Sequence, residues 1–181
     1  STPPASVKVV IVTNSTFTAP GTSDGLAFSA MANAKRPWSQ HLFLTELCRD
    51  VGTPMPKRKG LGTWQERGIM LINMCPVSSP YRKTRLDDLL KEEFRLLVGE
   101  TLYKLSRRKN KKLVVIFVGE GVKRSLNLHV DRDLRPDNVL VLSVNNPNNL
   151  APSSGTPLKG SSIFTKAAKF LGANPKELWR L

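Results

Sequence analysis

The chain has little of several residue types that mark common functional classes. Its 181 residues include only two cysteines and two histidines. Cys48 and Cys75 have no C-x-x-C spacing, which argues against a cysteine-rich zinc module and against a disulfide framework. His41 and His129 stand alone in the sequence, so we expect no metal site. No P-loop or dinucleotide-binding glycine pattern is present, and we expect no cofactor.

Long apolar runs and acidic residues are also scarce. No run approaches the roughly 20 apolar residues needed to span a bilayer, so we expect neither an integral membrane protein nor a membrane partner. Asp and Glu number 14 against 28 Lys and Arg, which gives a formal net charge of +14. With 40% hydrophobic residues the chain has enough apolar side chains for a packed core. The sequence therefore predicts a basic folded protein.

The basic residues gather in short segments of the chain. A surplus of this size exceeds the net charge of about 2–8 that keeps a small domain soluble, and it favours a polyanionic partner. Clustered Lys and Arg bind phosphates and set affinity without reading base sequence, so nucleic acid is the favoured partner. The candidate nucleic-acid-binding residues are Lys57, Arg58, Lys59, Lys104, Arg107, Arg108, Lys109, Lys111 and Lys112.

Short apolar runs alternate with helical periodicity along the chain. Four runs predict buried strands, over residues 7–12, 69–72, 113–118 and 139–144. Apolar residues at helical spacing predict helices over 39–50 and 86–105, and a last helix that starts near Ser161 or Ser162. Helices between strands imply parallel pairing, so we expect an α/β fold with three α/β/α layers and a central four-stranded parallel sheet. Ligands of such sheets bind beyond the carboxyl ends of the strands.

Four ordered segments carry a family resemblance. Residues 7–29, which include Pro20-Gly21 and Gly25-Leu-Ala-Phe-Ser29, resemble the first strand and water-activating loop of family 1 uracil-DNA glycosylases. Residues 64–73, 114–119 and 146–166 resemble the later blocks of that family, in the same order. The resemblance covers nearly all of the chain from Val7 onward. It implies a single uracil-DNA glycosylase-like domain over 1–181, without the family's N-terminal helices.

Two positions depart from the chemistry that the resemblance implies. The family has Gly-Gln-Asp-Pro-Tyr-His in its first loop, where this chain has Thr13-Asn-Ser-Thr-Phe-Thr18. Ser15 stands in place of the Asp that orients water and stabilises the cationic sugar. A neutral hydroxyl is a poor base and supplies no negative charge. Asn146 stands in place of the His that stabilises the departing uracil. Both changes predict that uracil excision is lost.

Other positions match the family's base pocket. These base-pocket candidates are Asn14, Phe17, Phe28, Asn73 and Leu150. By the resemblance, Phe28 stacks on the extruded uracil, Asn73 hydrogen-bonds its Watson–Crick edge and Leu150 fills the gap left in the duplex. These three residues also have purely structural interpretations. Phe28 could be a core ring, Asn73 could cap a strand end and Leu150 could be an ordinary loop residue.

The loops that grip the DNA backbone in the family are altered here, at Arg36-Pro37-Trp38-Ser39 and at Gly119-Glu120. The basic segments at 57–59 and 104–112 are expected to lie away from the strand-end loops. These features favour an inactive protein that binds RNA (rRNA), beside neighbouring proteins, in a ribonucleoprotein such as a mitochondrial ribosome. A mitochondrial location is expected on that hypothesis, with the nucleus as the alternative.

Two other hypotheses stay open at this point. One is a DNA-binding pseudoenzyme that recognises uracil or DNA without excision. The other is an active glycosylase with altered chemistry, in which Asn14 or Asn146 positions the water.

Overall fold

A four-stranded parallel sheet forms the centre of the molecule. The structure, a computed structural model, describes residues 3–76, 85–119, 121–126, 134, 137–149 and 155–181. The strands are β1 (Val9–Ser15), β2 (Ile69–Cys75), β3 (Leu113–Val118) and β4 (Val139–Val144). They are hydrogen-bonded in the order β2-β1-β3-β4, with every neighbouring pair parallel. The predicted α/β fold with a central four-stranded parallel sheet is confirmed.

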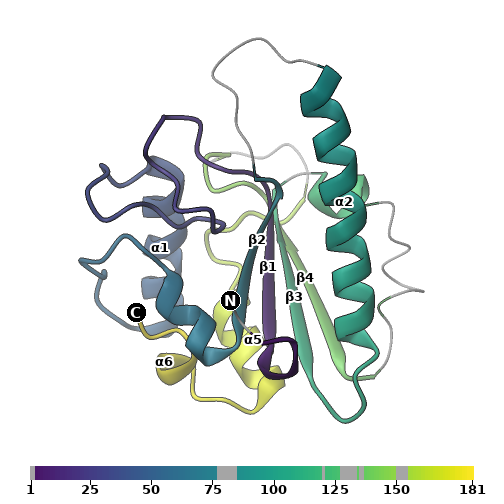
Figure 1. The fold of residues 1–181 in the computed structure, drawn as a ribbon. Coiled ribbons are helices and arrows are strands. Elements are labelled where there is room, and N and C mark those ends of the chain that lie inside the picture. The colour runs from purple at the N-terminus through teal and green to yellow at the C-terminus, as the bar shows by residue number, and fades with distance from the viewer. Residues whose placement is uncertain (1–2, 77–84, 120, 127–133, 135–136, 150–154) are drawn as a thin grey trace.

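Helices cover both faces of this sheet (Figure 1). One face carries α1 (Trp38–Val51), the short 3-10 helix η2 (Gly62–Arg67), α5 (Ile163–Leu171) and α6 (Pro175–Leu178). The opposite face carries α2 (Arg85–Ser106) and the four-residue α3 (Val122–Ser125). A further 3-10 turn, η1 (Pro4–Ser6), precedes β1. No helix within these described segments is long and apolar enough to cross a membrane.

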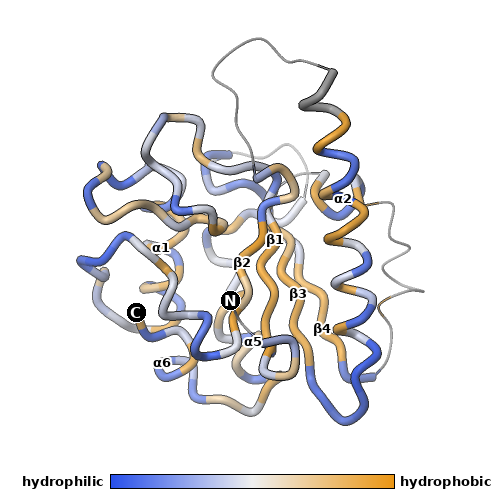
Figure 2. The backbone as a smooth tube through the Cα atoms, viewed as in Figure 1, coloured by the Kyte–Doolittle hydropathy of each residue, from blue (hydrophilic) through white to orange (hydrophobic). Residues whose placement is uncertain are grey.

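The strands are apolar along nearly their whole length (Figure 2). The central strands β1 and β3 are buried on both faces, whereas the edge strands β2 and β4 are partly exposed. Alternate side chains of β1 and β3 enter two separate cores. On the α1 and α5 side, the core contains edge-to-face aromatic pairs of Phe164 with Phe43 and of Phe164 with Trp179. On the α2 side it is mostly aliphatic, with Leu102 and Leu105 packed on the sheet.

The predicted elements lie close to the observed ones. The strands at 113–118 and 139–144 have the expected bounds, and the helix expected over 39–50 is one residue longer at each end. The first strand runs further than expected, to Ser15, because Ser15 still pairs with Cys75 of β2. The sequence missed η1, η2, α3 and α6, which have three to six residues and show no helical period.

Candidate active site

A pocket of about 650 Å³ opens at the carboxyl ends of β1 and β3. Its walls come from the end of β1 and the loop after it (residues 13–19), the segment that starts α1 (residues 35–39), the end of β3 and the loop after β4. This is the edge at which parallel sheets bind ligands, and the fold therefore places the pocket where the sequence predicted a site. The volume is in the range of small-molecule pockets.

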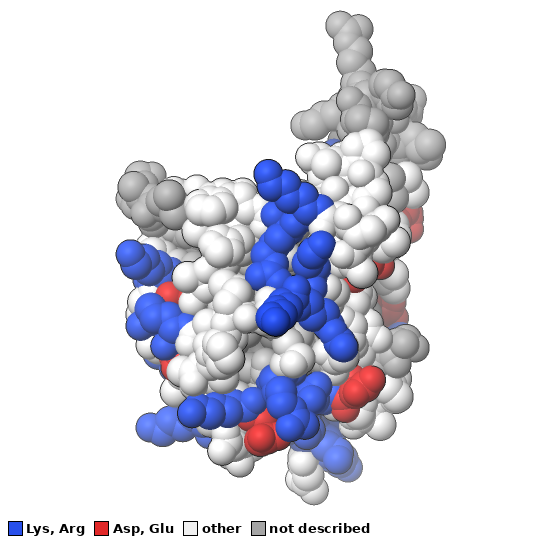
Figure 3. Space-filling view, turned by 90° about the vertical axis from the view of Figure 1, so that its left-hand side faces the viewer, with Lys and Arg blue, Asp and Glu red and all other residues white. Residues whose placement is uncertain are grey.

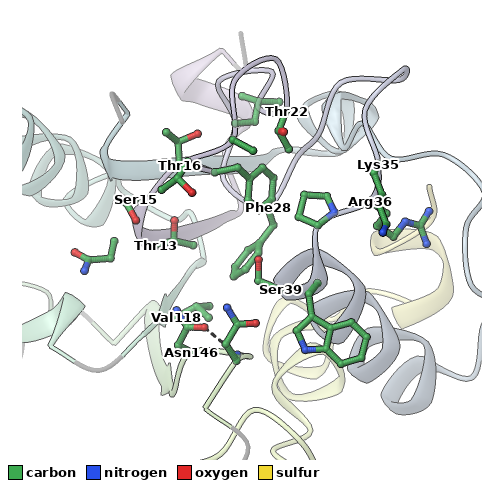
Figure 4. A pocket seen from close by; sticks show the side chains of 18 residues that line it. Thr13, Ser15, Thr16, Thr22, Phe28, Lys35, Arg36, Ser39, Val118 and Asn146 are labelled. Atoms are coloured by element: carbon green, nitrogen blue, oxygen red, sulfur yellow. Dashed lines mark hydrogen bonds between the residues drawn. The ribbon is translucent and has the colours of Figure 1, made fainter. Parts of the chain in front are cut away.

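The Phe28 ring lies in the middle of this pocket (Figure 4). The Phe28 ring stacks on the Phe43 ring of α1, with ring centroids 4.3 Å apart and an interplanar angle of 10°. The backbone of Phe28 has a φ of +57°, a conformation that bulky residues rarely adopt. Gln40 stabilises this conformation because its Nε2 donates to the Phe28 carbonyl oxygen over 2.6 Å. Phe28 thus belongs to the core and also presents a ring surface to the pocket.

Hydroxyl and amide groups supply the polar wall at the end of β1 and in the loop that follows it. Asn14, Ser15 and Phe17 all line the pocket, so the structure brings these three predicted positions together with Phe28. The Thr16 hydroxyl donates to the Ser23 hydroxyl over 2.6 Å, which ties this loop to the next turn of chain. No Asp or Glu is among the described residues that line the pocket.

Asn146 lines the pocket from the loop after β4. Its Oδ1 accepts a hydrogen bond from the Asn148 amide nitrogen over 2.9 Å, which fixes the orientation of the carboxamide. The Asn146 carbonyl oxygen accepts from the amide nitrogen of Asn149 over 2.8 Å. Because Oδ1 is held by the backbone, Nδ2 is the end of this side chain that is left to donate to a ligand.

Asn73 lies behind the pocket rather than in its wall. Thr13 lines the pocket, and Asn73 stands opposite Thr13 on the neighbouring strand. The Thr13 hydroxyl donates to Asn73 Oδ1 over 2.6 Å. Asn73 is 4% exposed, and its Nδ2 has no hydrogen-bond partner among the described residues. The role of Asn73 in reading a base stays a prediction, and Thr13 is the group that faces the pocket. Leu150 lies outside the described residues.

Comparison with known proteins identifies the family of the chain. A scan of protein-family models finds none that matches the chain. The chain is 31% identical over 179 residues to the uracil-DNA glycosylase of Thermobifida fusca, covering 97% of this chain and 72% of that protein. The chain belongs to the uracil-DNA glycosylase family. It is 27% identical over 184 residues to the uracil-DNA glycosylase of Acinetobacter baylyi, covering 100% of this chain and 73% of that protein.

A solved structure shows the same fold. The crystal structure of mimivirus uracil-DNA glycosylase matches with a TM-score of 0.66 and 19% sequence identity. The match covers 94% of this chain and 66% of that chain. The predicted membership of a uracil-DNA glycosylase-like fold is therefore confirmed.

The relatives overturn the main functional prediction. They are named as uracil-DNA glycosylases, which are enzymes, and nothing in the described structure shows this chain to be inactive. The hypothesis of an inactive structural component of a mitochondrial ribosome is therefore wrong on these comparisons. The expected rRNA and ribonucleoprotein partners depended on that hypothesis and are not supported either. None of these comparisons tests the mitochondrial or nuclear location, which stays a prediction.

The basic segment at 57–59 lies beside the pocket, contrary to the expectation that it would be remote. Arg36, in the pocket wall, donates from Nη2 to the carbonyl oxygens of Pro56 and Arg58 over 2.6 and 2.9 Å. Lys59 Nζ donates to the Ala34 carbonyl oxygen over 2.6 Å. The sequence could not show this placement, because these hydrogen bonds join residues 20 to 25 positions apart.

The segment at 104–112 lies at the opposite edge of the sheet, as expected, and many of its cations have partners within the protein. Arg108 donates to the carbonyl oxygens of Pro4 and Val7 over 2.7 and 2.8 Å, and burial lowers the pKa of its guanidinium. Lys112 Nζ donates to the Phe170 carbonyl oxygen and lies over that ring. The remaining partners are Glu100, 2.7 Å from Lys104, and the Tyr103 ring, 5.0 Å from Arg107. Lys109 and Lys111 are exposed, and their side chains form no hydrogen bond or ion pair with a described residue.

His129 lies outside the described residues, and Cys48, Cys75 and His41 are the other candidate metal ligands of these types. No group of three or more His, Cys, Asp or Glu within the described segments could hold a metal ion. Cys48 is remote from the pocket lining, and its Sγ donates to the Pro54 carbonyl oxygen over 3.4 Å. Burial raises the pKa of the Cys48 thiol, so the unreactive protonated form is favoured at neutral pH.

Proposed function

We propose that the chain is a DNA glycosylase that cleaves the bond between a base and its deoxyribose, with amide and hydroxyl groups in place of a carboxylate and an imidazole. The observation that carries the proposal is the pocket at the strand ends, in which the Phe28 ring faces polar groups from two strand-end loops. A flat ring surface with convergent polar groups suits a base that has left the helical stack. The relatives named uracil-DNA glycosylase support uracil as the base and DNA as the partner.

The charges around the pocket favour departure of the base, on which negative charge develops. When the glycosidic bond breaks, electrons move to the base and positive charge develops on the sugar. Lys35 and Arg36 are the charged residues among those described in the pocket wall, and Asn146 offers Nδ2 as a donor. In this proposal Asn146 Nδ2 donates to the departing base, because a donor directed at developing negative charge lowers the barrier. The positive charges of Lys35 and Arg36 favour the same negative charge without a direct hydrogen bond. The developing positive charge on the sugar gains no such partner from the described wall.

The attacking water needs an acceptor that orients it. Asn14 lines the pocket, and no hydrogen bond or ion pair of its side chain is formed with a described residue. Its carboxamide oxygen accepts from water, as does the Ser15 hydroxyl beside it. Neither group is a strong base near neutral pH, so water is positioned rather than deprotonated before attack. One preorganised electrostatic partner is worth about 10²–10³ in rate, and we expect turnover slower than a carboxylate-bearing site would give.

The test is uracil release from single-stranded and duplex deoxyoligonucleotides under single-turnover conditions with the protein in excess. We expect slow but complete release, and a rate about 10²-fold lower for Asn146→Ala. The matched control is Asn149→Ala, which removes the same amide from an exposed position three residues along the same loop and outside the pocket wall. Absence of release at large protein excess, with DNA binding retained, would contradict excision and favour the DNA-binding pseudoenzyme.

A further inference from the structure

Two loops beside the pocket carry an unusual set of side chains. We call this surface the pocket-side patch, and it consists of Lys35, Arg36, Trp38, Lys57, Arg58 and Lys59. Figure 3 shows the side of the molecule that carries these loops, with Lys and Arg gathered over its centre and acidic atoms toward its margins. The patch adjoins the pocket, because Lys35, Arg36 and Trp38 also line the pocket wall.

The backbone of the patch is fixed by its own cations. Arg36 bridges to three successive carbonyl oxygens, those of Pro56, Lys57 and Arg58. Lys59 Nζ donates back to the carbonyl oxygens of residues 32 and 34, over 2.8 and 2.6 Å. Gln40 Nε2 donates both to the Lys59 carbonyl oxygen and to the Phe28 carbonyl oxygen, each over 2.6 Å. The loop that holds the cations is thus connected to the ring in the pocket.

No cation of the patch forms an ion pair with an acidic residue that the structure describes. The partners of Arg36 and Lys59 are neutral carbonyl oxygens. Lys35, Lys57 and Arg58 form no side-chain hydrogen bond or ion pair with any described residue. Glu66 lines the same hollow as Lys57, Arg58 and Lys59, without an ion pair to any of them. A cluster of cations without acidic partners, on a backbone that hydrogen bonds hold in place, is suited to successive phosphates.

Trp38 adds an exposed aromatic surface to these cations. Its side chain is 61% exposed, whereas Trp64 and Trp179 are buried. Trp38 stacks on His41 one turn along α1, with ring centroids 5.3 Å apart, which fixes the plane of the indole. It is the first residue of α1, whose first turn has no acidic residue and no side-chain cap. The free backbone N–H groups of that turn favour a nearby anion.

We propose that the pocket-side patch binds a single-stranded segment of DNA next to the base that enters the pocket. Phosphates contact Lys35, Lys57 and Arg58, and one neighbouring base stacks on Trp38. Cationic grooves with aromatic platforms are how proteins bind single strands, because an unpaired base has a free π-face. In a duplex those faces are covered by the adjacent base pairs. The choice of DNA rests on the proposed function.

The first test uses fluorescein-labelled single-stranded oligothymidylate of about 12 nucleotides, which contains no uracil. Trp38→Ala should raise its dissociation constant by about 5- to 150-fold, the loss expected for one stacked base. A duplex of the same length should be affected much less. Trp38→Phe keeps a ring and should retain most of the affinity, which controls for damage to α1. An unchanged affinity of Trp38→Ala for oligothymidylate overturns the proposal.

Intrinsic fluorescence gives an independent measurement. Since Trp38 is exposed and the other two tryptophans are buried, oligothymidylate should quench the emission of the native protein but not that of Trp38→Phe. Equal quenching in both proteins overturns the contact with Trp38.

The second test neutralises cations. Lys57→Gln with Arg58→Gln should weaken binding and reduce the slope of log affinity against log salt by about 1.4, since each phosphate contact on a single strand contributes about 0.7. The matched control is Lys109→Gln with Lys111→Gln, two exposed cations at the opposite edge of the sheet. Equal effects of the two pairs overturn the proposal. Because oligothymidylate binding is measured without excision, a protein that binds through Trp38 but releases no uracil would overturn only the proposed function.

Discussion

At the scale of single residues, the site differs from its sequence interpretation mainly at Thr13. The family motif has Gly at this position, and here the Thr13 side chain both lines the pocket and holds Asn73. Asn73 is buried, and Nδ2 at the other end of its carboxamide has no partner among the described residues. A buried amide with one paired end depends strongly on that one hydrogen bond. The Thr13 hydroxyl therefore fixes the direction in which the Asn73 amide points.

The first prediction concerns this pair. Thr13→Val keeps the shape but removes the donor, which leaves both ends of the buried Asn73 amide unpaired. We expect a loss of about 1–3 kcal/mol in the free energy of unfolding. In a protein of this size each kcal/mol lowers the melting temperature by about 2–4 °C, so thermal denaturation measures it. Thr13→Ser retains the hydroxyl and is the matched control.

A double variant separates pairing from packing. Thr13→Val with Asn73→Leu removes both polar partners and should be less destabilised than the two single changes added together. Additive effects would show that the hydrogen bond between Thr13 and Asn73 contributes nothing to stability.

At the scale of elements, the start of α5 shows how one helix fixes another. Ser162 is the N-cap residue but has a φ of +55° and makes no side-chain cap. Asp50, near the end of α1, replaces it: Oδ2 accepts from the amide nitrogens of Phe164 and Thr165, each over 3.0 Å. The Thr165 hydroxyl also donates to Asp50 Oδ1 over 2.7 Å. A carboxylate at a helix N-terminus also interacts favourably with the helix dipole.

The second prediction follows from this long-range cap. Asp50→Ala should lower the free energy of unfolding by about 1–2 kcal/mol, the usual value of an N-cap, and reduce the urea midpoint accordingly. Asp50→Asn keeps an acceptor oxygen and should lose less. A midpoint for Asp50→Ala equal to that of the native protein would mean that α5 begins without help from α1.

The elements that the sequence predicts well are those with strong local signals. β3 lies between Lys112 and Gly119, which bound an unbroken apolar run, and its limits follow directly. The loop at 56–59 has no such signal, because its position depends on Arg36 and Gln40, which donate to its carbonyl oxygens from far along the chain. The sequence gives no signal for Lys35, and it indicates Trp38 only as part of the altered loop Arg36-Pro37-Trp38-Ser39. A tryptophan in a basic, proline-containing segment was the signal available for Trp38.

At the scale of the whole molecule, two of the clusters that contribute to the net charge of +14 lie in different surroundings. In the pocket-side patch, Arg36 and Lys59 donate to neutral carbonyl oxygens. The side chains of the other cations of the patch form no hydrogen bond or ion pair with a described residue. At the opposite edge of the sheet, Arg108 and Lys112 connect separate parts of the chain. β1, with seven residues at about 3.3 Å each, places the two edges about 20 Å apart. That is more than twice the Debye length of about 8 Å at physiological ionic strength, so phosphates at one edge are largely screened from cations at the other.

The last prediction compares these populations through Arg108. Its guanidinium donates to the carbonyl oxygens of Leu105, Pro4 and Val7, which joins the end of α2 to the segment before β1. Arg108→Gln loses most of these bonds, and we expect the free energy of unfolding to fall by about 1–3 kcal/mol, measured by urea denaturation. The affinity for single-stranded DNA, measured at a temperature where the variant stays folded, should be unchanged, because all three guanidinium nitrogens of Arg108 already donate within the protein and the residue lies beyond the screening length from the pocket. If Arg108→Gln instead weakened DNA binding without loss of stability, the edge around 104–112 would be the nucleic-acid surface, and the positive charge beside the pocket would need another explanation.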